Sequence, residues 1–339
     1  MQSNIILKNY GLDANTALTP YGYENEEDWL ELRKKGIGGS DVGAIMGINK
    51  YSSPLKVYKA KVENIVEDIS EKVAVRKGKD LESLIRAVYV TPKLKGLGYT
   101  VRPLNHLLIN SNYPWLRANL DGIAIWDENP SDFTKHLVVE IKVVTEWAED
   151  NWYGEDYCGV PASYYAQVQE YMLVSGAKKA IVCALFEKSW TMHYFEINRD
   201  ERFLAELISK SKHFYDYHML MEVPPRVDFA IDKEFILEKI AEQETTPIAE
   251  YPDAELTAAA VEVKELKRQI KALEKEVNEK MSIVVDRYQK GGRSTSPVIK
   301  ISVKDVKSVR LDSTRLKEEQ PGIYEQYSKE TSSLRAEIR

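Results

Sequence analysis

The chain has 339 residues, of which 43% are hydrophobic and 29% charged, as in a soluble globular protein of about two domains. Its two cysteines, Cys158 and Cys183, can form neither a disulfide framework nor a four-thiolate metal site, so we expect a reducing, cytoplasmic compartment. A net charge of -6 argues against a protein that coats nucleic acid non-specifically, but it permits a nuclease with positive charge concentrated in one groove.

The amino-terminal 25 residues contain no basic segment followed by an apolar run. No stretch of the chain approaches the roughly 18 consecutive apolar residues of a membrane span. The sequence therefore predicts a protein that is neither secreted nor embedded in a membrane, with no membrane partner.

Capping residues predict short helices in the first 65 residues, because Ser, Asn and Asp accept hydrogen bonds from free backbone N–H groups at a helix start. Proline fits the first helical position. The predicted helices are residues 26–35 after Asn25, a short helix after Ser40 or Asp41 with Gly38 and Gly39 in the tight turn before it, and residues 55–63 after Ser53 and Pro54.

A further helix is predicted within residues 73–95, starting near Gly78, from apolar residues at helical spacing. Basic side chains at the start of this helix oppose its dipole, so we expect something anionic to offset them. These side chains are Arg76, Lys77 and Lys79.

The pattern then changes to β-branched and aromatic residues separated by Asn, Pro, Asp and Ser. Strands are predicted at residues 99–109, 115–126 and 136–144, as an antiparallel meander. A helix at 162–175, strands at 180–186 and 190–197, and a helix at 200–220 follow. This order predicts an α/β protein of the α+β kind, with a mixed central sheet flanked by helices.

The last hundred residues form a different region, which we place at 226–339, after a core of residues 1–225. Within residues 253–290, apolar side chains alternate spacings of three and four, as in a coiled-coil seam, until Lys280. We favour a helical arm packed on its own domain over an oligomer zipper. Linkers are predicted at Pro224-Pro225, at 245–252 and at Gly291-Gly292, and a basic, strand-like tail at 298–311.

One candidate site for chemistry combines Asp121 with Glu140 and Lys142. In a strand, Glu140 and Lys142 share one face while residues 139, 141 and 143 face the core. Two carboxylates from adjacent strands can hold a hard cation such as Mg²⁺, which would activate water against a phosphodiester, and Lys142 can balance the developing negative charge. Alone, this pattern is commonly a cross-strand ion pair.

Two further polar residues, one before and one after this trio in the chain, are also candidates for the site. Glu82 lies on the helix before the strands and could supply another metal ligand. Gln167 lies beside aromatic residues on the helix at 162–175.

Taken together, these motifs resemble the YqaJ-like viral recombinase family, the λ-exonuclease-type branch of the PD-(D/E)XK nucleases. The resemblance covers about residues 28–215. It is carried by Gly36-Ile37-Gly38-Gly39-Ser40-Asp41, Asn49-Lys50-Tyr51-Ser52-Ser53-Pro54, Gly78-x-x-x-Glu82, Leu120-Asp121-Gly122, Glu140-Ile141-Lys142 and Tyr165-x-Gln167-x-Gln169-x-Tyr171-Met172. The tail around Leu311–Lys317 and Pro321–Tyr327 is similar to the ends of many members.

The resemblance implies a PD-(D/E)XK core and a metal-dependent exonuclease that degrades one strand of linear double-stranded DNA from its 5′ end. The 3′ overhang would serve a single-strand annealing protein of the RecT or Redβ type in phage-type recombination. Asp121, Glu140 and Glu82 would hold Mg²⁺, with Mn²⁺ as an alternative, Lys142 would be the catalytic lysine, and Gln167 an active-site polar residue. A ring-shaped homotrimer around DNA is also implied.

The resemblance further assigns Arg33, Ser40 and Gly39 to a grip on the terminal 5′ phosphate, which suits a guanidinium and exposed backbone N–H groups. Asn119 stands where some members carry Ser as a phosphate contact. We add Arg76, Lys77 and Lys79 as candidates for a basic channel wall. Two alternatives stay open: a PD-(D/E)XK endonuclease with the same metal chemistry, and a catalytically idle scaffold that binds DNA ends.

Overall fold

The computed structural model describes residues 6, 7, 9, 12, 17–65, 73–243, 254–289 and 307–329. The chain divides into two compact units, Met1–Glu238 and Lys239–Arg339. The boundary between the units follows Glu238, whereas the sequence pattern placed it after residue 225.

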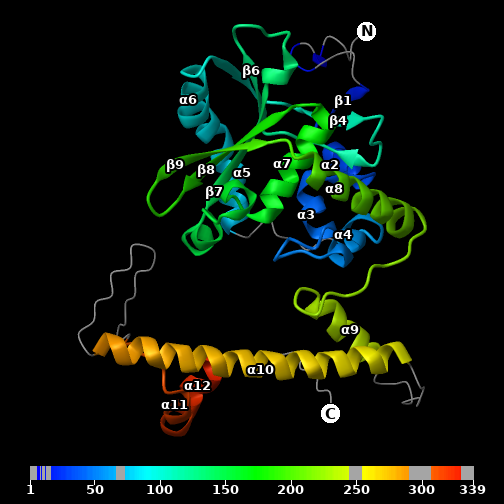
Figure 1. Cartoon of the computed structure of the whole chain (residues 1–339). Helices are drawn as coiled ribbons and strands as arrows, with labels where there is room; N and C mark the ends of the chain where they lie inside the picture. Colours follow the sequence, from blue (N-terminus) through cyan, green and yellow to red (C-terminus); the bar gives the residue numbers. More distant parts are fainter. Residues whose placement is uncertain are drawn as a thin grey trace. The chain divides into compact units, whose positions relative to one another are not determined.

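A five-stranded mixed sheet is the centre of the first unit (Figure 1). Its strands lie in the order β3 (Tyr99–Arg102), β6 (Gly122–Trp126), β7 (Leu137–Val144), β8 (Lys179–Phe186) and β9 (Thr191–Asn198). Strands β7 and β8 are parallel and joined through α7 (Ala162–Ser175), while all other neighbours are antiparallel. The predicted α/β class, with a mixed sheet flanked by helices, is confirmed.

Each face of the sheet is covered by its own hydrophobic core. On one face, Val138 and Val144 of β7 pack with α7 and with α3 (Gly39–Ile45), α4 (Pro54–Lys61) and α8 (Glu201–His213). On the other face, Val139 and Ile141 pack with α5 (Val73–Ile85) and α6 (Thr91–Lys95). The alternation along β7 therefore places Glu140 and Lys142 on the α7 side, opposite Val139 and Ile141, as the period of two predicted.

Two of the predicted helix starts are confirmed by their capping bonds. Helix α2 (Glu26–Lys34) begins after Asn25, whose side chain accepts from the backbone N–H of Asp28 at 2.9 Å. Helix α4 begins after Ser53, whose hydroxyl accepts from the N–H of Lys56 at 3.1 Å.

The start of α3 differs from the prediction. The residue before the helix is Gly38, which also ends β2 (Ile37–Gly38), and β2 pairs in parallel with β5 (Leu116–Arg117). Asp41 lies inside the helix and accepts from the N–H of Gly38 at 2.8 Å. Neither Ser40 nor Asp41 precedes the helix, because strand pairing holds Gly38 extended at that point.

The predicted antiparallel meander is confirmed in part, because β3, β6 and β7 are successive antiparallel neighbours, but two of the three predicted strands are interrupted. The run at 99–109 divides into β3 and β4 (His106–Asn110), because Pro103 has no N–H to continue a ladder. Strand β4 leaves the central sheet and pairs with β1 (Leu18–Gly22), and the run at 115–126 divides into β5 and β6. Strands β3, β6 and β7, one from each predicted run, keep the antiparallel order in the central sheet.

Helix α5 is described from Val73, so Arg76, Lys77 and Lys79 follow its first turn and the expected clash with the helix dipole does not arise. The helical path continues through a π-helical stretch, Arg86–Val90, into α6. Helix α8 likewise continues as a π-helical stretch, Phe214–Leu220.

After the segment that holds Pro224-Pro225, the chain forms α9 (Lys233–Gln243). The carboxyl-terminal unit contains the long helix α10 (Ala254–Gln289) and the short helices α11 (Ser313–Glu319) and α12 (Pro321–Tyr327). The predicted linkers at 245–252 and 291–292, and the tail up to residue 306, lie outside the described residues. Both cysteines are free, and no helix among the described residues is long and apolar enough to cross a bilayer.

Candidate active site

Asp121 lies in a bend immediately before β6 rather than inside a strand. Its carboxylate accepts a hydrogen bond from the backbone N–H of Ile141 on β7 at 2.7 Å. This bond fixes Asp121 beside Glu140, since the two backbones are already in register through the pairing of Gly122 with Val139. Burial raises the pKa of Asp121, although Lys142 opposes the shift.

Glu140 is the centre of the polar cluster and is 1% exposed. Its Oε1 atom contacts Lys142 Nζ at 2.5 Å and accepts from the side-chain amide of Gln167 at 2.8 Å. Burial and repulsion from Asp121 raise the pKa of Glu140 to about 8. Its Oε2 atom has no hydrogen-bond partner among the described residues.

Lys142 and Gln167 are both held by aromatic side chains of α7. The Lys142 Nζ atom lies 4.7 Å from the centre of the Tyr164 ring, and Gln167 also donates to the hydroxyl of Tyr171 at 2.9 Å. Burial alone would lower the pKa of Lys142, but the carboxylates of Glu140 and Asp121 outweigh it and raise the pKa. Lys142 is therefore a firmly charged ammonium.

Glu82 projects from α5, which covers the opposite face of the sheet, and pairs with Arg86 one turn later. Burial and the charge of Asp121 raise the pKa of Glu82, so its carboxylate lies within electrostatic range of the cluster. However, among the described residues no three Asp, Glu, His or Cys side chains stand close enough together to hold a metal ion. Glu82 as a third ligand stays a prediction.

The side chains nevertheless suit a hard divalent cation. Asp121 and Glu140 offer carboxylate oxygens, which Mg²⁺ and Mn²⁺ prefer, and Glu140 has a buried oxygen that no protein group satisfies. Repulsion between the buried carboxylates, which contributes to the raised pKa of Glu140, would be relieved by a cation. Mg²⁺ or Mn²⁺ therefore fits Asp121 and Glu140.

The predicted phosphate grip lies at the end of α2 and the start of α3. The guanidinium of Arg33 donates to the hydroxyl of Ser40 at 2.7 Å and lies over the Trp29 ring at 4.8 Å. A Cβ atom on Gly39 would approach the Tyr171 ring to 2.5 Å and the Gln167 side chain to 3.1 Å. Gly39 thus places the grip directly against Gln167, which donates to Glu140, and against Tyr171, which accepts from Gln167.

A buried ion pair beneath the grip was not found in the sequence. Asp41 contacts Lys61 Nζ at 2.8 Å, and Lys61 also donates to the backbone carbonyl of Arg33 at 2.9 Å. Lys61 and Arg33 lower the pKa of Asp41, although its burial acts the other way. The pair is carried by α3 and α4, and their contact is a tertiary one that no local motif announces.

Glu170 is the second residue that sequence reasoning missed. It is fully buried on α7, and neither of its carboxyl oxygens has a hydrogen-bond partner among the described residues. Burial and the charge of Asp41 raise its pKa well above the ordinary value, against the lowering effect of Arg117 and Arg33. Burial without a hydrogen-bond partner therefore favours the neutral form of Glu170, behind the grip.

The other sequence candidates lie further from this cluster. Asn119 accepts a hydrogen bond from the hydroxyl of Tyr23 at 3.4 Å. Arg76, Lys77 and Lys79 share α5 with Glu82, and Lys77 pairs with Glu187 at the end of β8. The structure brings together Asp121, Glu140, Lys142 and Gln167, and sets Arg33, Ser40 and Gly39 beside them.

Gln169, the second glutamine of the motif on α7, does not contact Glu140 in the hydrogen bonds that the structure shows for it. Its amide nitrogen donates to the carbonyl of Asn198 at 2.8 Å, and its oxygen accepts from the N–H of Asp200 at 3.0 Å. Both ends of the side chain are used to hold α7 to the chain after β9. Gln167 is accordingly the glutamine of the site.

The comparisons with known proteins agree with these motifs. The family model of the YqaJ-like viral recombinase domain matches residues 28–178. The chain is 26% identical to the uncharacterized protein YqaJ of Bacillus subtilis (strain 168) over 333 residues, which cover 93% of this chain and 94% of the relative.

Two solved structures show a lower similarity. An alkaline exonuclease from Laribacter hongkongensis has 18% identity and a TM-score of 0.44, covering 64% of this chain and 98% of its own. A phage-related exonuclease from Haemophilus somnus 129PT has 13% identity and a TM-score of 0.40, covering 57% and 100%.

Proposed function

We propose that this protein is a metal-dependent exonuclease that acts on ends of linear double-stranded DNA, because residues 28–178 match the family model of the YqaJ-like viral recombinase domain. It would degrade one strand from its 5′ end and leave a 3′ overhang for a single-strand annealing protein. The observation that supports this proposal most strongly is the buried Glu140 carboxylate, shared between Lys142 and Gln167, beside Asp121.

Asp121 and Glu140 would hold the metal, with Glu82 nearby. Bound there, a divalent cation would polarise the phosphodiester and lower the pKa of a water ligand. Lys142 presents a fixed positive charge toward the negative charge that develops on the phosphate oxygens. Gln167 holds one oxygen of Glu140 in place, which leaves Oε2 as the oxygen without a protein partner.

The grip on the end of the strand is assigned to Arg33 and Ser40. A guanidinium can form two parallel hydrogen bonds to a phosphate, and Ser40 already orients the guanidinium of Arg33. Contact of Gly39 with Gln167 and Tyr171 sets the distance between the gripped end and the carboxylates. A fixed distance of this kind suits stepwise removal of nucleotides from an end.

The test compares linear duplex DNA, with and without a 5′ phosphate, to the same DNA closed into a circle, in Mg²⁺ and in EDTA. We expect metal-dependent loss of the linear, 5′-phosphorylated substrate alone. Lys142→Ala should abolish the loss, and Arg33→Ala should remove the preference for the 5′ phosphate. Lys34→Ala changes a neighbouring surface cation and is the matched control.

The remaining outcomes separate the alternatives. Cutting of the circle would favour a PD-(D/E)XK endonuclease, and binding of ends without cutting would favour an idle scaffold. The charged trio of Asp121, Glu140 and Lys142 argues against the scaffold, since burying it is costly for a protein without chemistry to perform. We also propose a homo-oligomer, and light scattering would distinguish a dimer from the ring-shaped trimer that the family resemblance implies.

A further inference from the structure

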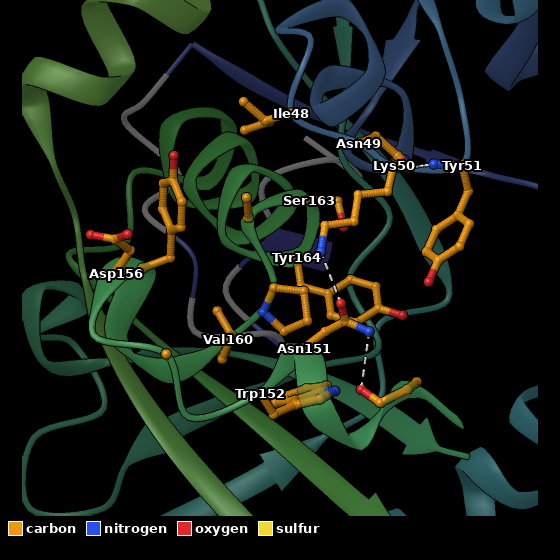
Figure 2. A pocket seen from close by; sticks show the side chains of 15 residues that line it. Ile48, Asn49, Lys50, Tyr51, Asn151, Trp152, Asp156, Val160, Ser163 and Tyr164 are labelled. Carbon is orange, nitrogen blue, oxygen red and sulfur yellow. Dashed lines mark hydrogen bonds between the residues drawn. The ribbon is translucent and has the colours of Figure 1, made fainter. Parts of the chain in front are cut away.

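A cavity of about 410 Å³ lies beside the candidate active site, between residues 48–51 and the segment that leads into α7 (Figure 2). Rings of Tyr51, Trp152, Tyr157 and Tyr164 contribute to its lining. The volume falls in the range of small-molecule sites, roughly 300–1,000 Å³. The cavity is therefore large enough for a flat aromatic ligand.

Several polar groups of the lining are already engaged with one another. Lys50 donates to the side-chain oxygen of Asn151 at 3.0 Å, and the amide nitrogen of Asn151 donates to the carbonyl of Ala148 at 3.3 Å (Figure 2). The side chain of Asn49 accepts from the N–H of Tyr51 at 2.8 Å. What remains for a ligand is mainly aromatic surface, which favours stacking over recognition of hydrogen-bonding edges.

Tyr164 connects the cavity to the carboxylate cluster. Its ring lines the cavity and also supports Lys142, whose Nζ atom lies 4.7 Å from the ring centre. Lys142 in turn contacts Glu140 at 2.5 Å. A group in the cavity would thus be separated from the reacting phosphate by little more than one aromatic ring.

We propose that this cavity receives a nucleobase of the strand being cleaved, next to the scissile phosphate. The proposal rests on the proposed nuclease function and specifies how that site holds its substrate. Every nucleobase has an aromatic face, so stacking in this cavity tolerates any sequence. An exonuclease that proceeds along DNA requires such tolerance.

The variant that tests the proposal is Tyr51→Ala. Tyr51 is 75% exposed, so its removal should leave the fold intact. Stacking of a base on an aromatic ring is worth enough to raise KM on the order of tenfold when the ring is lost, with kcat little changed. Tyr51→Trp should restore KM, and Trp147→Ala, which removes a 92% exposed ring that does not line the cavity, is the matched control.

A second measurement uses linear DNA with one abasic nucleotide near the 5′ end. The wild type should pause at that nucleotide, by on the order of tenfold, because no base enters the cavity. Tyr51→Ala should show no additional pause there. Equal pauses in both proteins, or an equal rise in KM for Trp147→Ala, would overturn the cavity proposal while leaving the nuclease intact. A wild type that digests no linear DNA would overturn both.

An independent inference concerns the exposed apolar seam of α10, defined as Leu256, Val263, Leu266, Ile270, Leu273 and Val277. Five of these side chains, all except Val263, are 49–66% exposed. Along the seam, β-branched Val263, Ile270 and Val277 alternate with Leu266 and Leu273. Val or Ile at the first seam position with Leu at the second favours two parallel strands.

In place of the packing on its own domain that the sequence pattern favoured, we infer that the occupant of this seam is the same helix of a second copy of this chain. In a parallel pair, Glu262 of one copy comes beside Lys267 of the other, at the flanking positions where opposite charges select partner and direction. This pairing occurs twice by symmetry. The charge pattern therefore supports a parallel, in-register pair.

Disulfide trapping in the full chain tests this inference. In a Cys158→Ser background, Ile270→Cys should give a covalent dimer under mild oxidation. Val261→Cys, on the outer face of the same helix and 62% exposed, should not. Absence of the Ile270→Cys dimer, or equal trapping at both positions, would overturn the inference.

Discussion

The neutral state of Glu170 leads to a quantitative prediction for Glu170→Gln. Glutamine keeps the shape of the side chain but cannot ionise. A carboxyl whose pKa is raised in the folded protein keeps a proton that the unfolded chain has released, so ionisation of the unfolded chain favours unfolding. Wild-type stability must therefore fall as pH rises above the ordinary pKa of 4.5, until the pH reaches the folded-state pKa.

The magnitude follows from the linkage between protons and folding. One proton difference changes the free energy of unfolding by about 1.4 kcal/mol for each pH unit. The variant lacks this titration, so its stability relative to wild type should rise by about 1.4 kcal/mol per pH unit in that window. The test rests on how the stability difference changes with pH and not on its absolute value. The buried amide of glutamine leaves polar atoms unsatisfied, which lowers the stability of the variant by the same amount at every pH.

The assay is urea unfolding of both proteins at pH 5, 6 and 7 at constant ionic strength. Glu201→Gln is the control, because a hydrogen bond from Arg199 lowers the pKa of the exposed Glu201 below its ordinary value of 4.5. Both the folded and the unfolded chain have released this proton above pH 5, so the stability difference between wild type and Glu201→Gln should stay constant from pH 5 to 7. A difference between wild type and Glu170→Gln that stays constant with pH would refute the neutral, unpartnered Glu170.

Three further substitutions probe the grip and the cluster. Gly39→Ala should destabilise the folded protein by about 1–3 kcal/mol in thermal unfolding and abolish DNA digestion, because the added Cβ atom has no room. Gly78→Ala is the control: no atom lies within 4 Å of the added Cβ, so the change should be neutral or stabilise the protein by up to about 1 kcal/mol. Lys61→Met should cost about 1–3 kcal/mol, because Asp41 loses its ion-pair partner and keeps only the N–H of Gly38 as a hydrogen-bond donor, and should weaken the preference for 5′-phosphorylated ends. Gln167→Leu should lower kcat on linear DNA about 100-fold with a smaller change in KM, since Glu140 loses its donor; unchanged kcat would contradict that role.

Local sequence patterns were sufficient to predict the features that depend on residues close together in the chain, such as helix starts and the two faces of a strand. Asn25 and Ser53 began helices as their side chains predicted, and the alternation in β7 assigned Glu140 and Lys142 to one face. An alternating run, however, does not specify its partner strand. For this reason the run containing β3 and β4 was read as one strand, although Pro103 divides it between two sheets.

The buried parts of the site could not be predicted from the sequence, because they depend on contacts between residues that are far apart in the chain. Lys61 and Asp41 are twenty residues apart and form a pair only because α3 and α4 pack together. A carboxylate on a helix is ordinarily exposed to solvent, and only tertiary packing encloses Glu170. Gly39 was predicted in a turn, but its need for a hydrogen side chain comes from the Tyr171 ring of a distant helix.

Helix α7 carries Tyr164, Gln167, Glu170 and Tyr171 within about two turns. The rigid helix therefore fixes the distances between the cavity, the carboxylate cluster and the grip. Inserting or deleting a single residue there would rotate everything beyond it by about 100°. Substitutions can change each function separately, but a change of length would disconnect all of them at once. This segment should therefore be the part of the chain least tolerant of insertions, even where each side chain can be exchanged.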